Sequence, residues 1–214
     1  DGVTIKIRKF IPVAAGMAGG STDAAAVLVG VNRMFDLGFT KKELMERGVK
    51  LGADVPYCIM RGTALSEGIG EILTELPAPP QCHLVIAKPQ ISVSTKAVYG
   101  KLRVNELAPE EHPDIDGMME SIKNGDLDGV IGRLGNVLET VTVPDHPEIA
   151  EIKKIMMENG ACGSLMSGSG PTVFGIYKDK EQAEKVCQVL RDADGGRLTR
   201  QVYLTEFYNR KKAR

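Results

Sequence analysis

The chain has 214 residues, of which 43% are hydrophobic and 26% are charged, and its formal net charge at pH 7 is -1. This length and composition are typical of a globular protein with one large domain or two small ones, and the balanced charge argues against a nucleic-acid partner. No apolar run approaches the ~20 residues that a membrane-spanning helix needs, so no membrane association is expected.

The four cysteines, Cys58, Cys82, Cys162 and Cys187, are widely spaced and form no C-x-x-C pair. This spacing argues against a zinc site and against a disulfide framework. We therefore expect no metal ligands among them, but buried, reduced thiols in a cytoplasmic protein.

The first predicted elements are a strand and a helix, joined by a loop of small residues. Residues 3–7 alternate between apolar and polar side chains, which is the period of a half-buried strand, and Pro12 ends this strand. Residues 24–35 are apolar nearly all round, which predicts a deeply buried helix. Gly38 follows its end and suits a left-handed C-cap.

A second helix is predicted from Thr40 to about Lys50, because Thr40 and Glu43 have the spacing of a capping box. Strand-like stretches follow at residues 57–60 and 63–66, and a turn is predicted at residues 67–70. Residues 76–80 contain three prolines, which resist both helix and sheet. A domain boundary is therefore predicted after Ala78.

The second part of the chain mixes strands and helices without strict alternation. Strands are predicted at residues 83–87, 163–166, 172–177 and 201–207, and helices at residues 94–102, 114–124, 126–138, 147–158 and 180–191. Such a mixture favours an α+β fold over a doubly wound parallel sheet.

The loop IPVAAGMAGGSTDAAA, residues 11–26, places three glycines directly before the first helix. A dinucleotide site needs G-x-G-x-x-G, but Ala18 stands where its second glycine would be. A Walker A loop needs a lysine after the last glycine, where this chain has Ser21. Two interpretations stay open: a tight turn capped by Ser21 or Thr22, and a phosphate site lined by the backbone of a helix N-terminus.

Two further stretches carry candidate functional residues. Asp54 precedes Pro56 and is either a helix cap or a general base. Residues 167–172, SGSGPT, form a second glycine loop, which by itself predicts a turn between strands.

These stretches together resemble the motifs of the GHMP kinases, a family that includes galactokinase, homoserine kinase, mevalonate kinase and phosphomevalonate kinase. Residues 12–25 resemble the family's phosphate-binding motif P-x3-G-(M/L)-A-G-G-S-(S/T)-D-A-A. Residues 51–57 (LGADVPY), 67–71 (EGIGE) and 166–172 (MSGSGPT) occur in the family's order. They are most similar to the members that act on a cytidine-diphosphate-linked methylerythritol.

The resemblance implies a two-domain α+β fold: an N-terminal domain like domain 2 of ribosomal protein S5, partial here, and a ferredoxin-like C-terminal domain. Residues 1–78 would be the C-terminal part of the ATP-binding domain, and residues 79–214 the substrate-binding domain. Family members have an earlier segment with an active-site lysine and an aromatic–histidine pair that holds cytosine. Because no counterpart is found in this sequence, the chain is expected to begin inside a domain.

The resemblance also implies roles for individual residues. Asp54 would be the general base, and the ATP phosphates would be held by Pro12, Val13, Ala14, Ala15, Gly16, Met17, Ala18, Gly19, Gly20, Ser21 and Thr22. Substrate contacts would come from Ile69, Thr95, Tyr99, Ser167, Gly168 and Ser169, with Tyr99 stacking on the cytosine. Ala14, Ala15 and Ala18 stand where some relatives have glycine, and their methyl groups are tolerable where φ is negative.

The implied activity is transfer of the ATP γ-phosphoryl group to the 2-hydroxyl of the methylerythritol substrate, in isoprenoid precursor synthesis. ATP and Mg²⁺ are the expected cofactors, a small molecule the expected partner, and a monomer or homodimer in the cytoplasm the expected form. Two alternatives stay open. One is a GHMP kinase of the homoserine or mevalonate type, and the other is a non-catalytic nucleotide-binding module if the protein truly starts at Asp1.

Overall fold

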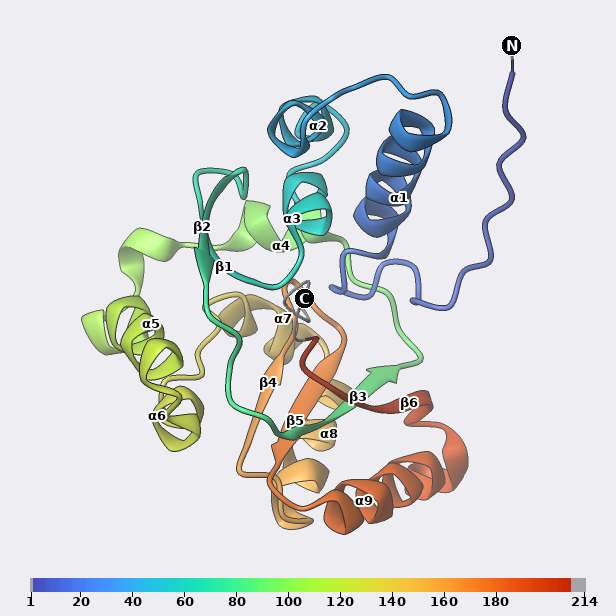
Figure 1. The fold of residues 1–214 in the computed structure, drawn as a ribbon. Coiled ribbons are helices and arrows are strands. Elements are labelled where there is room, and N and C mark those ends of the chain that lie inside the picture. Colours follow the sequence, from blue (N-terminus) through green and yellow to red (C-terminus); the bar gives the residue numbers. More distant parts are fainter. Residues whose placement is uncertain (1, 209–214) are drawn as a thin grey trace. The chain divides into compact units, whose positions relative to one another are not determined.

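The computed structural model describes residues 2–208 (Figure 1). The chain divides into two compact units, and the division falls after Glu75. The first unit comprises residues 1–13 and 17–75, and the second comprises residues 14–16 and 76–214. Three residues of the glycine loop therefore pack with the second unit rather than with the helix that follows them.

The first unit contains three helices and a β-hairpin: α1 (Gly19–Met34), α2 (Lys41–Gly48), α3 (Val55–Met60), β1 (Thr63–Glu67) and β2 (Ile72–Leu76). Its core is formed by Ala25, Leu44, Val55 and Ile59. The predicted second helix and its capping box are confirmed, because Thr40 Oγ1 accepts from the Glu43 amide while the Glu43 carboxylate accepts from the Thr40 amide. The strand at residues 63–66 and the turn after it are also confirmed.

Three predictions for the first unit are wrong. Residues 3–7 form no strand, because no described strand pairs with them, and Val3, Ile5 and Ile7 stay 45–56% exposed. The helix α1 is not deeply buried, since Ala25 is its only buried residue among those described. Only one stripe of that helix meets the small core, which leaves its other apolar side chains partly or fully exposed.

Residues 57–60 are helical rather than strand-like. Pro56 stands in the first turn of α3, where its missing N–H costs nothing, and its ring presets the backbone for a helix. The Cys58 amide donates to the Asp54 carbonyl at 3.0 Å, which closes the first helical turn. The apolar run was too short to distinguish a buried helix from a strand by periodicity.

The second unit is built on an antiparallel four-stranded sheet of order β4-β5-β3-β6. Its strands are β3 (His83–Pro89), β4 (Gly163–Met166), β5 (Val173–Tyr177) and β6 (Thr199–Glu206). Its α-helices are α4 (Thr95–Lys101), α5 (Ile115–Asn124), α6 (Leu127–Gly132), α7 (Glu139–Asp145), α8 (Pro147–Glu158) and α9 (Lys180–Asp192). Short 3₁₀ turns are η1 (Val104–Glu106), η2 (Pro109–Glu111) and η3 (Ala193–Gly196).

Both faces of the sheet are covered. Helices α8 and α9 pack on one face, where Val85, Val173 and Tyr177 join the main core with Ile152 and Val186 (Figure 1). On the other face the alternate residues form a second cluster, with Leu84, Phe174 and Ile176 against Ile131 of α6. Alternation along β3 and β5 therefore feeds two separate cores.

Most predicted elements of the second unit are confirmed, but the predicted helix at residues 126–138 is wrong. Helix α6 ends at Gly132, and a separate helix, α7, begins at Glu139. Between them Asn136 turns its amide group toward distant carbonyls, so the chain follows a tertiary contact rather than the helical repeat.

The cysteine prediction is partly wrong. Cys82 and Cys187 are buried, but Cys58 is half-buried and Cys162 is exposed, and all four are free thiols. Burial raises the pKa of the Cys82 thiol to about 11. Among the described residues, no helix is long and apolar enough to cross a membrane.

Candidate active site

In the first turn of α1 the backbone N–H groups before Thr22 have no partner among the described residues, so they are available to an anion. Ala18 precedes the helix in the left-handed conformation and makes no side-chain cap. Thr22 donates both its amide and its hydroxyl to the Ala18 carbonyl, at 2.8 and 3.0 Å. The amides of Gly19, Gly20 and Ser21 lie before this first bond, at the positive end of a helix of 16 residues.

The alanines of the loop depart from the sequence-based expectation. Ala14 has φ 51° and Ala18 has φ 48°, so two of the three alanines adopt the left-handed backbone conformation rather than a negative φ. This conformation costs an alanine roughly 1 kcal/mol or more relative to its usual conformations. The loop therefore keeps a glycine-like path even where the residue is alanine.

Asp54 lies in the first unit near the N-terminus of α1. It stands at the N-cap of α3, but its side chain makes no cap hydrogen bond and is exposed. Its neighbours locate it: Cys58 Sγ lies 3.5 Å from Thr22 Oγ1, and a Cβ placed on Gly52 would lie 3.8 Å from Ser21 Oγ. The carboxylate has no hydrogen-bond or ion-pair partner among the described residues, so the side-chain cap interpretation is not supported.

Ile69 lies in the turn between β1 and β2 and is 72% exposed. The turn packs against the residue before Asp54, because a Cβ placed on Gly70 would lie 3.4 Å from the Ala53 carbonyl oxygen. An exposed apolar side chain is thus held beside the segment that carries the free carboxylate.

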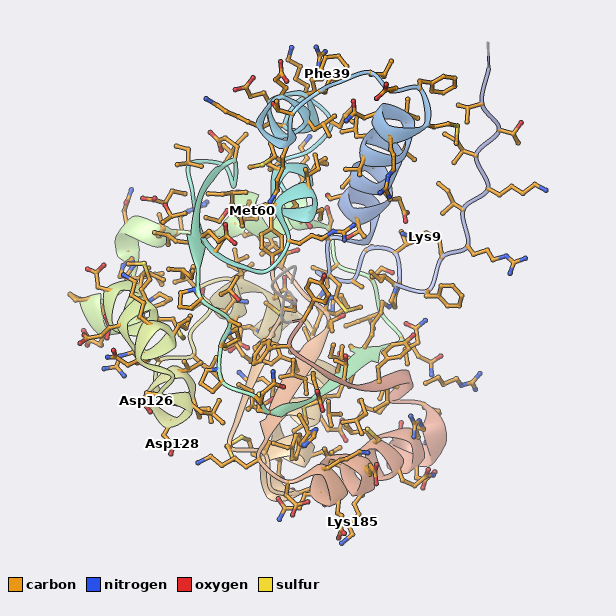
Figure 2. The ribbon with its side chains drawn as sticks, viewed as in Figure 1. Lys9, Phe39, Met60, Asp126, Asp128 and Lys185 are labelled. Atoms are coloured by element: carbon orange, nitrogen blue, oxygen red, sulfur yellow. The ribbon has the colours of Figure 1, made fainter. Side chains whose placement is uncertain are left out.

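Lys9 is a candidate site residue that no sequence motif indicates. Its Nζ lies 2.6 Å from a carboxylate oxygen of Asp23, and a Cβ placed on Gly19 would lie 3.3 Å from the same nitrogen. Figure 2 labels Lys9 on the extended segment before the glycine loop. The first turn of α1 therefore has an ammonium group beside it, although no lysine follows the last glycine. The sequence signal would have been a lysine three positions before Pro12, which no motif spacing singled out.

The second glycine loop belongs to the second unit. Ser167 Oγ donates to the Gly16 carbonyl at 2.7 Å, and a Cβ on Gly16 would collide with the Ser167 carbonyl oxygen. Gly16 has φ 67°, so glycine is required there by both conformation and space. The predicted donor Ser167 is thus engaged with the first glycine loop.

Thr95 and Tyr99 lie on one face of α4, four residues apart. Thr95 Oγ1 and Ser169 Oγ share a hydrogen bond of 2.8 Å, and Ser169 is buried. Tyr99 is 61% exposed, with a flat ring available for stacking. The second unit thus brings together Thr95, Tyr99 and the loop at residues 167–169.

No group of three or more His, Cys, Asp or Glu side chains within residues 2–208 is placed to hold a metal ion. Among the described residues, the side-chain oxygens near the first turn of α1 include the hydroxyls of Ser21 and Thr22 and the carboxylates of Asp23 and Asp54.

Comparisons with known proteins show the family of this chain. The family model of the GHMP kinases N terminal domain matches residues 1–62, and the model of the GHMP kinases C terminal region matches residues 118–194. A 4-diphosphocytidyl-2-C-methyl-D-erythritol kinase of Lachnospira eligens is 56% identical over 97% of this chain and 70% of its own length. The corresponding kinase of Lachnoclostridium phytofermentans is 51% identical over 99% of this chain and 71% of its own.

A crystal structure of a 4-(cytidine 5'-diphospho)-2C-methyl-D-erythritol kinase superposes with a TM-score of 0.76 at 29% identity, over 92% of this chain and 68% of that one. The sequence motifs, the fold and these relatives lead to one conclusion. The chain belongs to the GHMP kinases, and among them to the 4-diphosphocytidyl-2-C-methyl-D-erythritol kinases.

Proposed function

We propose that the protein transfers the γ-phosphoryl group of ATP to the 2-hydroxyl of 4-diphosphocytidyl-2-C-methyl-D-erythritol, in the non-mevalonate route to isoprenoid precursors. The observation that carries the proposal is the unpartnered Asp54 carboxylate beside the first turn of α1, in a chain of this family. Phosphoryl transfer depends on positioning and on electrostatic stabilisation more than on covalent chemistry. The helix terminus and the carboxylate can supply both.

The triphosphate is proposed to bind at the first turn of α1. Bare amides and the partial positive charge of the helix terminus stabilise phosphate oxygens. Lys9 adds an ammonium group at the same turn, where its partner Asp23 holds it. Mg²⁺, bound with ATP, would neutralise charge on the phosphates, and Ser21 or Thr22 would supply a protein oxygen.

Asp54 is proposed to orient the acceptor hydroxyl and accept its proton as the oxygen attacks. Its exposed carboxylate can reach a bound ligand without breaking an existing hydrogen bond. Thr95, Tyr99 and Ile69 are proposed to contact the acceptor, with Tyr99 stacking on the cytosine ring.

The proposal is tested by incubating the protein with Mg-ATP and a panel of acceptors. Phosphate transfer to the cytidyl substrate is expected, and transfer to homoserine or mevalonate is not. Product is measured by phosphorus NMR, which also reports which hydroxyl carries the phosphate. Transfer to mevalonate or homoserine without the cytidyl substrate would assign the protein to another GHMP kinase activity, and ATP binding without any transfer would favour a non-catalytic module.

The assignment of residues 1–78 to an ATP-binding domain and residues 79–214 to a substrate-binding domain remains a proposal. The same holds for the cytoplasmic location and for the monomeric or homodimeric state. Gel filtration of the purified protein measures the last of these directly.

A further inference from the structure

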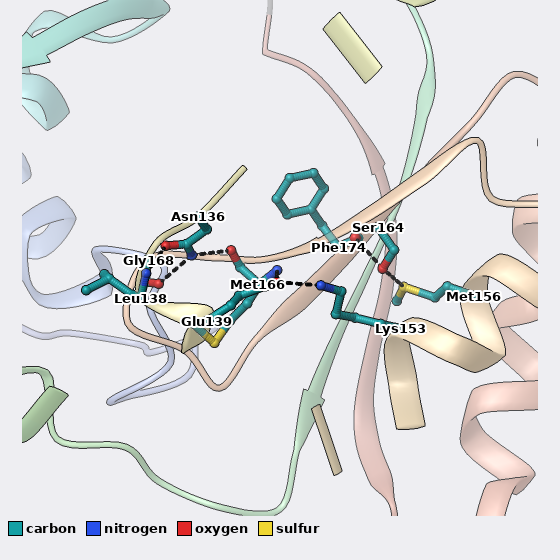
Figure 3. A network of polar contacts seen from close by, with 9 residues as sticks. All are labelled: Asn136, Leu138, Glu139, Lys153, Met156, Ser164, Met166, Gly168 and Phe174. Carbon is teal, nitrogen blue, oxygen red and sulfur yellow. Dashed lines mark hydrogen bonds and ion pairs between the residues drawn. The ribbon is translucent and has the colours of Figure 1, made fainter. Parts of the chain in front are cut away.

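The segment Met166–Ser169 of the second glycine loop has every one of its carbonyl oxygens occupied. Asn136 Nδ2 donates to the carbonyls of Met166 and Gly168, at 2.9 and 2.8 Å (Figure 3). The Ser167 carbonyl accepts from the Gly170 amide at 3.0 Å, and the Ser169 carbonyl accepts from Thr142 Oγ1 at 3.3 Å. The negative ends of these four peptide groups are therefore turned toward protein donors.

The amides of the same segment are divided. The Met166 amide donates to Glu139 Oε1 at 2.7 Å, and the Ser167 amide donates to the Thr172 carbonyl at 2.8 Å. The amides of Gly168 and Ser169 donate to no group among the described residues. Two successive N–H groups, with Gly168 at φ 55°, are thus left free, and such pairs of amides bind anions in proteins.

Asn136 controls the direction of one of these amides. The peptide group between Gly168 and Ser169 is planar and trans, so its C=O and N–H point in opposite directions. Because Asn136 holds the carbonyl of that peptide, it also holds the Ser169 N–H facing away from itself. Exchanging the positions of Oδ1 and Nδ2 of Asn136 would break three hydrogen bonds. In the observed orientation Oδ1 accepts from the Leu138 amide at 3.0 Å, and Nδ2 donates to two carbonyls.

A half-buried ion pair lies next to Asn136, because the amide of its member Glu139 donates to the Asn136 carbonyl at 3.0 Å. Glu139, at the start of α7, accepts the Met166 amide with one oxygen and Lys153 of α8 with the other, the latter at 2.5 Å. Their side chains are 19% and 26% exposed, so solvent screens this pair less than it screens the surface ion pairs. The pair ties the end of β4 to α8, the helix packed on the sheet (Figure 3).

We propose that Asn136 is a positioning residue that aims the Ser169 N–H, together with that of Gly168, at a phosphate oxygen of a bound substrate, and that Glu139 and Lys153 hold it in place. The inference rests on the proposed phosphoryl transfer, because that reaction supplies the anion. Both ATP and the diphosphate of the acceptor carry the required chemistry, and the experiment distinguishes them.

The test compares Asn136→Asp with the unchanged protein. A carboxylate in place of the amide repels the two carbonyls, so the Gly168–Ser169 peptide turns and its N–H leaves the ligand. The KM of the substrate whose phosphate the loop binds, either ATP or the acceptor, is expected to rise about tenfold to a hundredfold, as when a hydrogen bond to a charged group is lost. The KM of the other substrate should change less than twofold, which tells ATP from the acceptor.

The matched control is Asn159→Asp. Asn159 Nδ2 donates to one carbonyl, that of Ile155, at the end of α8 and away from the loop. Both KM values should stay within twofold in this variant. If Asn136→Asp lowers thermal stability but leaves both KM values unchanged, Asn136 is merely structural and the inference is wrong.

A second measurement does not depend on folding of the variant or on turnover. Inorganic pyrophosphate is titrated into the unchanged, isotope-labelled protein, and amide shifts are followed by NMR. The Gly168 and Ser169 amide protons are expected to move downfield as they bind the anion. If neither moves while pyrophosphate binds elsewhere, the inference is overturned. If no acceptor of the panel is phosphorylated, the proposed reaction is rejected. The titration still decides whether the Gly168 and Ser169 amides bind an anion.

Discussion

At the scale of single residues, the candidate site is defined by groups that the fold leaves without partners. Among residues 2–208, the Asp54 carboxylate at the start of α3 has no partner, and the first-turn amides of α1 donate to no group. The serines of the second loop are different, because Ser167 and Ser169 hydroxyls are already bonded to Gly16 and Thr95. Backbone N–H groups, rather than these hydroxyls, are the donors that remain for a ligand.

Replacing Asp54 tests its role as the base. Asp54→Asn keeps the shape of the side chain but cannot accept a proton, so kcat is expected to fall about 10²–10⁴-fold. The KM of ATP should change little, because the substitution lies outside α1 and does not alter the backbone N–H groups of its first turn. Steady-state kinetics with the cytidyl substrate measure both values.

The matched control for this change is Asp116→Asn. Asp116 stands in the first turn of α5 and has no hydrogen-bond or ion-pair partner among the described residues. Its replacement should leave kcat within twofold. If Asp54→Asn turns over at the rate of this control, Asp54 takes no part in proton transfer.

At the scale of elements, helices begin where a local hydrogen bond closes their first turn. The capping box of α2 is complete, with Thr40 Oγ1 accepting the Glu43 amide at 3.3 Å and the Thr40 amide donating to Glu43 Oε2 at 2.8 Å. The Thr40 hydroxyl and amide lower the pKa of the Glu43 carboxyl from its usual value. Four residues suffice for this signal, which is why sequence analysis predicted it.

Thr40→Ala is expected to lower the free energy of unfolding by about 1 kcal/mol, because it removes the side-chain cap. The loss should depend on pH. Since the folded pKa of Glu43 is lowered, its contribution is present above the unfolded pKa and disappears as the pH falls through the folded pKa. Urea denaturation at pH 7 and at pH 3 measures the difference between the two proteins.

Lys42→Ala is the control, since Lys42 lies in the same turn outside the box. It should change stability less than Thr40→Ala at both pH values. An equal loss from Thr40→Ala at pH 7 and pH 3 would contradict the contribution of the ionised Glu43 carboxylate.

At the scale of the whole molecule, the two compact units have very different cores. Among the described residues, the main core of the second unit contains eighteen buried residues between the sheet and its helices, whereas the core of the first unit contains four. Since buried apolar area supplies most of the stabilising free energy, the first unit is predicted to open more easily.

Native-state hydrogen exchange tests this prediction. Amides of the central strands β3 and β5 are expected to exchange last, with the free energy of global unfolding. Amides of α1 and α2 should exchange through a local opening whose free energy is lower than that of global unfolding by at least about 1 kcal/mol. Equal protection in the two units, measured by NMR under the same buffer conditions, would contradict the prediction that the first unit opens more easily.

The fold was predictable where a short stretch carries its own signal. The capping box at Thr40, the strands β3 and β5 and the helix α9 were all read from local pattern and confirmed. Predictions failed where a distant partner decides. Residues 3–7 have the alternation of a strand but no described strand to pair with, and the apolar residues of α1 outnumber the core available to them.

The sequence by itself determined the family of this protein, because it has a glycine loop before a helix, an aspartate before Pro56 and a second glycine loop in the order of the GHMP kinases. Only the tertiary structure decided which groups are free to act. Lys9 reaches the first turn of α1 across 14 positions, and Asn136 reaches Gly168 across 32. No local pattern encodes such contacts, because packing and hydrogen bonding between distant segments create them when the chain folds.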